Sequence, residues 1–252
     1  MVVSVLLGLL FLLRGKVLSV ISYNCRYNAH LSFKDVGDMF LQDIHTAHVI
    51  SGYDVFAPIF AVLPSATIFC DDFNSGYIKW ILNRSSRKRY IKEIMLCSSV
   101  GGSLAIFLPS LLSGLFYLIN GKLNFYDDDL SFLFLGETVY ANFQYVWNGI
   151  AMFLFLLAIS LLFGAFWSNV GLLVSILTTN KYLTLVMPFA LYFIIHLILY
   201  RTGGLLFSPM NVLMPSASFI PFISFPVVYQ GILLFLIILV CKRLFKEKLQ
   251  NV

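Results

Sequence analysis

Few residues of this sequence have the type and spacing that metal binding or proton transfer requires. Asp43, His45 and His48 form an Asp-x-His-x-x-His pattern, and histidines three residues apart can share a helix face and ligate zinc. No distant fourth ligand accompanies them, so we interpret this segment as a solvated helix or a lid and predict no metal site. His196 stands alone within an apolar run, where we expect a hydrogen-bonded packing role rather than a proton relay.

The sequence also lacks motifs for phosphate binding and for catalysis within a membrane. A phosphate-binding loop needs Gly-x-x-x-x-Gly-Lys-Ser/Thr, in which backbone amides and the lysine hold the phosphates. The two Gly-Lys pairs are Gly15-Lys16 and Gly121-Lys122, with Leu10 and Phe116 in place of the first glycine and Val17 and Leu123 in place of the hydroxyl residue. The apolar stretches contain no His-Glu-x-x-His motif and no paired glutamates. We therefore predict that this chain is not an enzyme, has no catalytic residues and holds no cofactor of its own.

Two other groups of reactive side chains have simple interpretations. The four cysteines, Cys25, Cys70, Cys97 and Cys241, lack metal spacing, and we interpret them as small apolar residues. The acidic run 127–129 is interpreted as a solvated charge run. Its alternative role is to attract a cationic molecule such as a basic peptide.

The elements that position these residues follow from composition. Of the 252 residues, 60% are hydrophobic and 12% are charged, and the mean hydropathy is +0.88. Soluble domains are about 45–50% apolar and about 25% charged, so a soluble globule is excluded. A helix needs about 20 apolar residues to cross a bilayer. Six stretches fit this requirement, and they predict an all-α polytopic membrane protein with a single transmembrane domain over 1–252: 2–22, 53–70, 94–119, 147–178, 183–200 and 226–241.

Two of these stretches have unusual features. The fourth is longer than a bilayer requires, so we expect it to tilt, to begin as an interfacial segment, or to break near the small and polar residues Gly164, Ser168, Asn169 and Gly171. The first contains Arg14 and Lys16, which either snorkel to the headgroups or face a polar interior or a partner. A cleavable signal peptide is the competing interpretation of residues 1–22, although a basic start is missing.

The distribution of basic residues sets the expected orientation. With the N-terminus in the cytoplasm, the inner loops carry eleven basic residues: Lys79, Arg84, Arg87, Lys88, Arg89, Lys92, Lys181, Lys242, Arg243, Lys246 and Lys248. The outer loops, 23–52, 120–146 and 201–225, carry four: Arg26, Lys34, Lys122 and Arg201. The positive-inside rule therefore predicts that both termini are cytoplasmic. The basic charge then faces anionic lipid, and we predict no nucleic-acid partner.

The loop 71–93 is the longest hydrophilic segment on the predicted inner side. Tyr77, Ile78, Ile81 and Leu82 recur at helical spacing, after Asn74 and Ser75 as candidate caps and Gly76 as a turn residue. This pattern predicts a short amphipathic helix. Its basic residues would rest on anionic lipid in any membrane protein, whereas its apolar ridge could instead dock on a cytoplasmic partner.

The same loop and the helix after it resemble the permease subunits of type-2 ATP-binding cassette (ABC) transporters. The similar features are an acidic end of the second helix at Asp71 and Asp72, a Ser75-Gly76-Tyr77 turn, a short coupling helix over 78–83, a basic run over 84–90 and the pair Gly101-Gly102. A second similarity is TTNKYLTLVMPFALYFI, in which an Asn180-Lys181 inner turn opens a helix that carries Met187-Pro188-Phe189. The resemblance covers the layout of six spans and is specific over about residues 66–115 and 157–195. It is closest to a subgroup from Gram-positive bacteria.

This resemblance implies partners and a location. It implies two cytoplasmic ABC ATPase subunits, which bind ATP and Mg, a second permease that is the same or a related chain, and the lipid bilayer of the bacterial cell membrane. The coupling helix would be seated in an ATPase groove. The residues that the resemblance assigns to ATPase coupling are Asp72, Asn74, Ser75, Gly76, Tyr77, Ile78, Ile81, Arg84, Arg87 and Arg89.

The expected function is export of an amphiphilic substrate such as a peptide, lipid or drug. The apolar stretches contain few ionisable groups besides Arg14, Lys16 and His196, so a charged path for ions or sugars is not supported. The alternatives are a non-transporting immunity or sensor protein and a membrane-embedded enzyme. Permeases of this family usually begin with a cytoplasmic amphipathic segment, whereas this sequence begins in apolar residues at Met1. Either the start is truncated or that segment is absent, and the usual cytoplasmic gate is in question.

Overall fold

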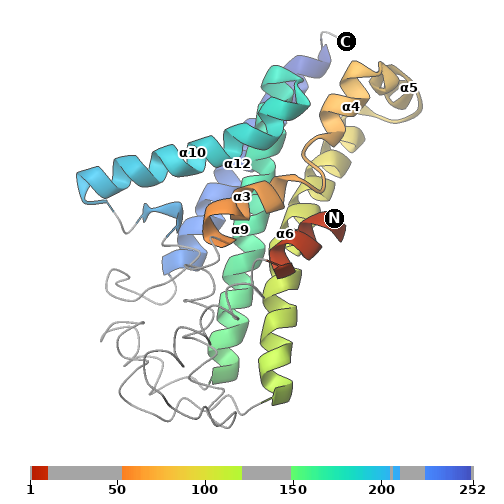
Figure 1. The fold of residues 1–252 in the computed structure, drawn as a ribbon. Coiled ribbons are helices and arrows are strands. Elements are labelled where there is room, and N and C mark those ends of the chain that lie inside the picture. Colours follow the sequence, from red (N-terminus) through yellow and green to blue (C-terminus); the bar gives the residue numbers. More distant parts are fainter. Residues whose placement is uncertain (1, 11–52, 121–148, 205–206, 211–224, 251–252) are drawn as a thin grey trace.

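The computed structural model describes residues 2–10, 53–120, 149–204, 207–210 and 225–250, and these residues form helices and turns without a strand. Residues 2–10 are helical. The other main helices are α3 (Tyr53–Val62), α4 (Ile68–Asn74), α5 (Tyr77–Arg84), α6 (Arg87–Asn120), α9 (Gly149–Thr178), α10 (Lys181–Thr202) and α12 (Phe225–Gln250) (Figure 1). The expected all-α fold is confirmed for the described part of the chain.

Four of the described helices are long and apolar enough to cross a bilayer: Arg87–Leu112, Leu157–Thr178, Lys181–Thr202 and Phe225–Gln250. They correspond to the third, fourth, fifth and sixth predicted stretches, and they indicate a membrane protein. Of the first stretch, residues 2–10 are helical, and 11–22, with Arg14 and Lys16, lie outside the described residues.

The second predicted stretch, 53–70, is not one helix, and that prediction is wrong in its continuity. The chain forms α3, then a turn over 63–67, then α4. Pro64 lies in this turn, and a proline has no N–H to donate and obstructs the carbonyl four residues before it. The amides of Ser65 and Ala66 both donate to the carbonyl oxygen of Val62, at 3.4 and 3.2 Å. The turn thus gives α4 a direction of its own.

The fourth predicted stretch does not break, and its small residues have another use. Helix α9 is continuous for 30 residues. A Cβ atom added to Gly164 would lie 2.3 Å from the carbonyl oxygen of Gly102, and one added to Gly102 would lie 2.3 Å from the Cβ of Ser168. The backbones of α6 and α9 therefore approach so closely that only glycine fits at these positions. The pair Gly101-Gly102 packs inside the subunit, as expected.

Serine hydroxyls and the Asn169 amide nitrogen form hydrogen bonds along this contact, which we call the seam. The Ser98 and Ser168 hydroxyl oxygens lie 2.8 Å apart, and the Ser103 hydroxyl donates to the carbonyl of Leu161 at 2.9 Å. The Asn169 amide donates to the Ser99 hydroxyl oxygen at 2.7 Å. Ser98, Ser168 and Asn169 are fully buried, so these hydrogen bonds replace bonds to water, whereas the Asn169 side-chain oxygen has no partner among the described residues.

Two apolar clusters lie beside the seam. The first joins α3, α6, α9 and α10 through Tyr53, Ala57, Phe60, Ala61, Ile106, Phe163, Trp167, Val170 and Tyr192. The second joins α4, α5, α6, α9 and α12 through Phe69, Ile78, Tyr90, Ile91, Ile94, Met95, Leu172, Ile176, Cys241, Phe245 and Leu249. The second cluster fixes α4 and α5 at the end of the bundle where α12 also ends (Figure 1).

Candidate functional site

The predicted short helix is present as α5, and with α4 it forms a bend that we call the elbow (residues 68–84). Helix α4 ends at Asn74, and Gly76 then adopts a left-handed conformation with φ of 71°, which costs glycine little. The Ser75 hydroxyl donates to the Asp71 carbonyl at 2.6 Å and accepts from the Tyr77 amide at 3.4 Å. Gly76 occupies the N-cap position of α5, so Asn74 and Ser75 are not the N-cap residues that the pattern predicted. Ser75 instead holds the bend between the two helices.

The faces of α5 differ from the predicted apolar ridge. Ile78 is 1% exposed and belongs to the second apolar cluster, and Ile81 and Leu82 are partly buried against the same cluster. Ile78 and Ile81 therefore hold α5 to its own chain. Tyr77 and Trp80 are 57% and 66% exposed, and residues three apart share a helix face. The structure thus adds Trp80, which the search for apolar spacing missed.

The polar residues predicted for coupling divide into two groups. Asp72 turns inward, since one of its carboxylate oxygens accepts a hydrogen bond from the Tyr90 hydroxyl of α6 at 2.9 Å. Arg84, Arg87 and Arg89 are exposed, and the Arg89 guanidinium pairs with Glu93 at 2.7 Å on the same helix. Asp72 therefore braces the elbow against α6, and the arginines are the group that lies on the surface.

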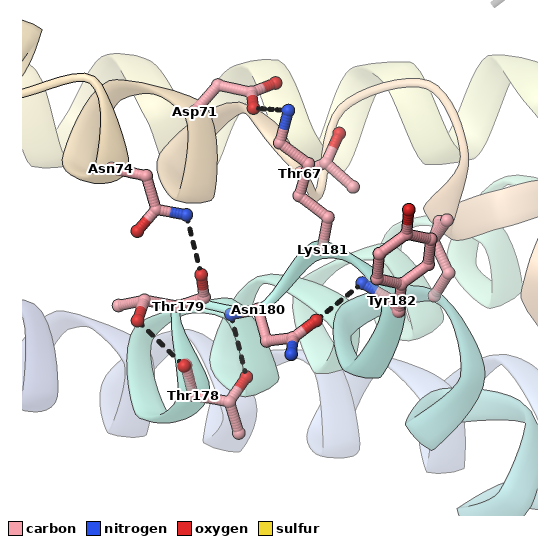
Figure 2. Close-up of a pocket in the computed structure, with 9 residues that line it drawn as sticks. Thr67, Asp71, Asn74, Thr178, Thr179, Asn180, Lys181 and Tyr182 are labelled. Carbon is pink, nitrogen blue, oxygen red and sulfur yellow. Dashed lines mark hydrogen bonds and ion pairs between the residues drawn. The ribbon is translucent and has the colours of Figure 1, made fainter.

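The structure brings together the two sequence segments that carry the resemblance. The Asn74 side-chain amide donates to the Thr179 carbonyl at 2.9 Å, and the Asp71 carboxylate forms an ion pair with Lys181. Deeper in, the Cys70 sulfur lies 3.4 Å from the Thr184 hydroxyl. Figure 2 shows the contacts of Asn74 and Asp71 across the gap between α4 and the α9–α10 turn. Sequence spacing alone does not predict these contacts, because more than 100 residues separate Asn74 from Thr179.

The α9–α10 turn is built by its own local chemistry. Thr179 has a φ of 51°, which lets the chain reverse direction within two residues. Asn180 caps α10, with its side-chain oxygen accepting from the amides of Tyr182 and Leu183 at 3.0 and 3.4 Å. Asparagine is among the best residues at this position. The tight Asn180-Lys181 turn expected from the sequence is therefore present.

An open cavity of about 690 Å³ lies between the elbow and this turn (Figure 2). We call it the turn pocket. It is lined by both polar and apolar surface of Thr67, Asp71, Asn74, Thr178, Thr179, Asn180, Lys181, Tyr182 and Leu185. The volume is in the range of small-molecule sites, and its charged groups are one carboxylate and one ammonium.

The remaining candidate residues supply no reactive site in the described part of the chain. No group of His, Cys, Asp and Glu residues there could hold a metal ion. His196 forms a hydrogen bond with the Ser208 hydroxyl at 2.7 Å, as expected for a packing role. Cys70 and Cys241 are buried and Cys97 is exposed. The Asp43-His45-His48 pattern, Cys25 and the acidic run 127–129 lie outside the described residues.

The chain was also compared with known proteins. No family model, curated protein or solved structure matches it.

Proposed function

We propose that this chain is the membrane-spanning permease subunit of a bacterial ABC exporter, driven by a separate cytoplasmic ATPase. The observation that carries the proposal is the two-sided arrangement of α5. Its inner face is fixed by Ile78, and its outer face presents Tyr77 and Trp80 to the surroundings. Large aromatic side chains on a rigid support are typical anchors of protein interfaces. The arrangement suits a helix that receives force from a partner without detaching from its own bundle.

The charge distribution supports a cytoplasmic location for this surface. The elbow, the α9–α10 turn and the C-terminal part of α12 lie at one end of the bundle, and Lys248 of α12 lies 5.2 Å above the ring of Phe73 in α4. All eleven basic residues assigned to the inner side belong to these segments or to the start of α6. Arg201, assigned to the outer side, is near the far end of α10. The positive-inside rule therefore favours the same orientation that the loops predicted.

The contacts of the elbow supply a route for coupling. A partner that displaces α5 would act on α6 through Asp72 and Tyr90, and on α10 through Asp71 and Lys181. Helices that shift as rigid bodies are a common basis of switching in transporters. ATP and Mg would bind to the ATPase, and the substrate class remains an amphiphilic peptide, lipid or drug. A second permease, the same or a related chain, would complete the assembly.

Co-purification with any ABC-class ATPase that a neighbouring gene encodes tests the proposal. The variant is Trp80→Ala, and the matched control is Phe235→Ala, which removes an aromatic side chain that is 62% exposed on α12. We expect Trp80→Ala to weaken ATPase binding about tenfold or more, as for an interface anchor, and Phe235→Ala to leave it unchanged.

Two other outcomes would refute this proposal in different ways. If Trp80→Ala and the double variant Tyr77→Ala, Trp80→Ala both bind the ATPase as tightly as the wild type does, α5 is excluded as the docking helix. Failure of the wild-type chain to bind the ATPase at all would favour the non-transporting immunity or sensor protein.

A further inference from the structure

We infer that the turn pocket binds the headgroup of a zwitterionic phospholipid, with the phosphate at Lys181 and a primary ammonium at Asp71. The inference requires only that the chain lies in a bilayer, and it does not depend on the export function. Its first support is the cavity itself. A volume of about 690 Å³ far exceeds what one ion or water molecule fills and suits a group the size of a lipid headgroup.

The charges of the pocket select the class of headgroup. Asp71 and Lys181 form the ion pair in the lining, and their side chains are 50% and 53% exposed. An ion pair with this much exposure to solvent contributes little stability. A ligand that carries both charges can therefore replace it with one contact to each residue. A purely anionic headgroup would satisfy Lys181 but would meet the Asp71 carboxylate with the same sign of charge. A zwitterion is matched at both groups.

The surroundings of the pocket indicate a lipid rather than a soluble zwitterion. Tyr182 and Leu185 of α10 form the less polar part of the lining. Beyond them, α10 carries an apolar exposed stripe with helical spacing: Leu183, Val186, Met187, Ile194, Leu197 and Ile198. At about 100° per residue, this stripe lies on a different face of α10 from the pocket residues Lys181 and Leu185, and it comes nearest to the pocket beside Tyr182. It continues along a helix that extends away from the rest of the bundle (Figure 1). Acyl chains of a lipid whose headgroup is in the pocket would have to pass Tyr182 to reach this stripe.

The location of the pocket is also consistent with headgroup depth. It lies where α9 ends and α10 begins, which is an end of two helices that can cross a bilayer. Tyrosine is enriched at this level of membrane proteins, and Tyr182 is 80% exposed. A pocket that holds one carboxylate, one ammonium and one aromatic side chain at this depth faces headgroups rather than hydrocarbon.

Native mass spectrometry of the purified full chain in detergent tests the inference. The probes are dioleoyl phosphatidylethanolamine, phosphatidylcholine with the same acyl chains, and water-soluble glycerophosphoethanolamine. Phosphatidylcholine carries the same charges, but its quaternary ammonium has no N–H to donate to Asp71. We expect phosphatidylethanolamine to bind about fivefold or more tightly than phosphatidylcholine.

The variants identify the groups involved. Asp71→Asn and Lys181→Met should each weaken phosphatidylethanolamine binding about fivefold, whereas Lys246→Met, which removes an exposed lysine of α12, should not change it. Thr67→Leu narrows the pocket without touching the ion pair, and the Thr67 side chain makes no capping bond to α4. This variant should also weaken phosphatidylethanolamine binding. It therefore tests the pocket even if the Asp71 and Lys181 variants fold poorly.

Three results would overturn the inference. Equal binding of the two phospholipids would remove the ammonium contact with Asp71. Unchanged phosphatidylethanolamine binding in Thr67→Leu would place the lipid outside the pocket. Binding of glycerophosphoethanolamine as tight as that of the full lipid would show a site for a soluble phosphate ester, to which the α10 stripe contributes nothing.

Discussion

The seam between α6 and α9 and the contact between the elbow and the α9–α10 turn both join distant segments through polar groups, but they do so in opposite environments. In the seam, Ser98, Ser168 and Asn169 are fully buried between backbones that only glycine allows to approach. At the elbow, Asp71 and Lys181 meet at an open pocket with about half of each side chain exposed. Breaking a seam bond leaves a buried polar group without water, whereas breaking the elbow contact returns both groups to solvent.

This difference suggests a division of labour within the bundle. A close-packed interface resists rearrangement, so we expect α6 and α9 to stay together. The exposed contacts of Asp71 and Asn74 open at low cost, whereas the contact of Cys70 with Thr184 is buried. The outer part of the elbow can therefore shift relative to the α9–α10 turn while the seam stays closed. The parts that the proposed function requires to move are therefore those with exposed contacts. The three predictions that follow test this comparison in order of decreasing effect.

The largest effect is expected from Gly102→Ala in the seam. The added Cβ would lie 2.3 Å from the Ser168 Cβ and 2.5 Å from the Gly164 carbonyl oxygen. Because one of these atoms belongs to the backbone, the helices must separate, and we expect a loss of about 3–4 kcal/mol in unfolding free energy. Thermal unfolding in detergent measures this loss.

The matched control is Gly231→Ala, since a Cβ there meets no atom within 4 Å. Alanine is a better helix former than glycine, so α12 should be unchanged or stabilised by about 0.5–1 kcal/mol. Equal stabilities of the two alanine variants would mean that the seam is not closely packed, and the contrast between the seam and the elbow would not hold.

An intermediate effect is expected from Ile78→Ala on the inner face of α5. Removing this buried side chain leaves a cavity in the second apolar cluster, and we expect a loss of about 2–3 kcal/mol, as for other large-to-small core changes. Trp80→Ala removes a larger side chain from the outer face, where it is 66% exposed, and should change stability by less than about 0.5 kcal/mol. Urea unfolding of both variants measures the difference, and a reversed order would contradict the assigned faces of α5.

Periodicity and composition predicted the elements of the fold better than their junctions. The apolar stretches of α6, α9, α10 and α12 were predicted because twenty apolar residues in succession leave few alternatives to a spanning helix. The break in 53–70 was missed because Pro64 lies within an apolar run and hydropathy does not register a missing N–H. In α9 the sequence suggested a break that the structure does not have. Gly164, one of the residues on which that suggestion rested, is instead a point of contact with α6.

The candidate site was predicted in part for a similar reason. The helix at 77–84 follows from local spacing, and the turn at Asn180 follows from the resemblance, whereas its capping bonds are seen only in the structure. The outward face of α5 cannot be predicted from local spacing, because Tyr77, Ile78 and Ile81 are all hydrophobic. The burial of Ile78 depends on residues of α4, α6 and α12. The contact of Asp71 with Lys181 depends on how the bundle folds, and no pattern in either segment contains that information.

The smallest effect is expected from Asn180→Ala, which removes the cap of α10 beside the turn pocket. The side-chain oxygen of Asn180 accepts from two backbone amides, and loss of such a cap costs about 1 kcal/mol. Asn180→Asp should retain most of the stability, because a carboxylate oxygen can accept the same bonds and its charge is favourable at a helix N-terminus. Asn83→Ala, at an exposed position of α5, is the matched control and should have almost no effect. Thermal unfolding of the three variants separates these cases. A loss in Asn180→Ala as large as that in Gly102→Ala would mean that the turn is as essential to the fold as the seam, and the elbow would then be a rigid part of the bundle instead of its adjustable end.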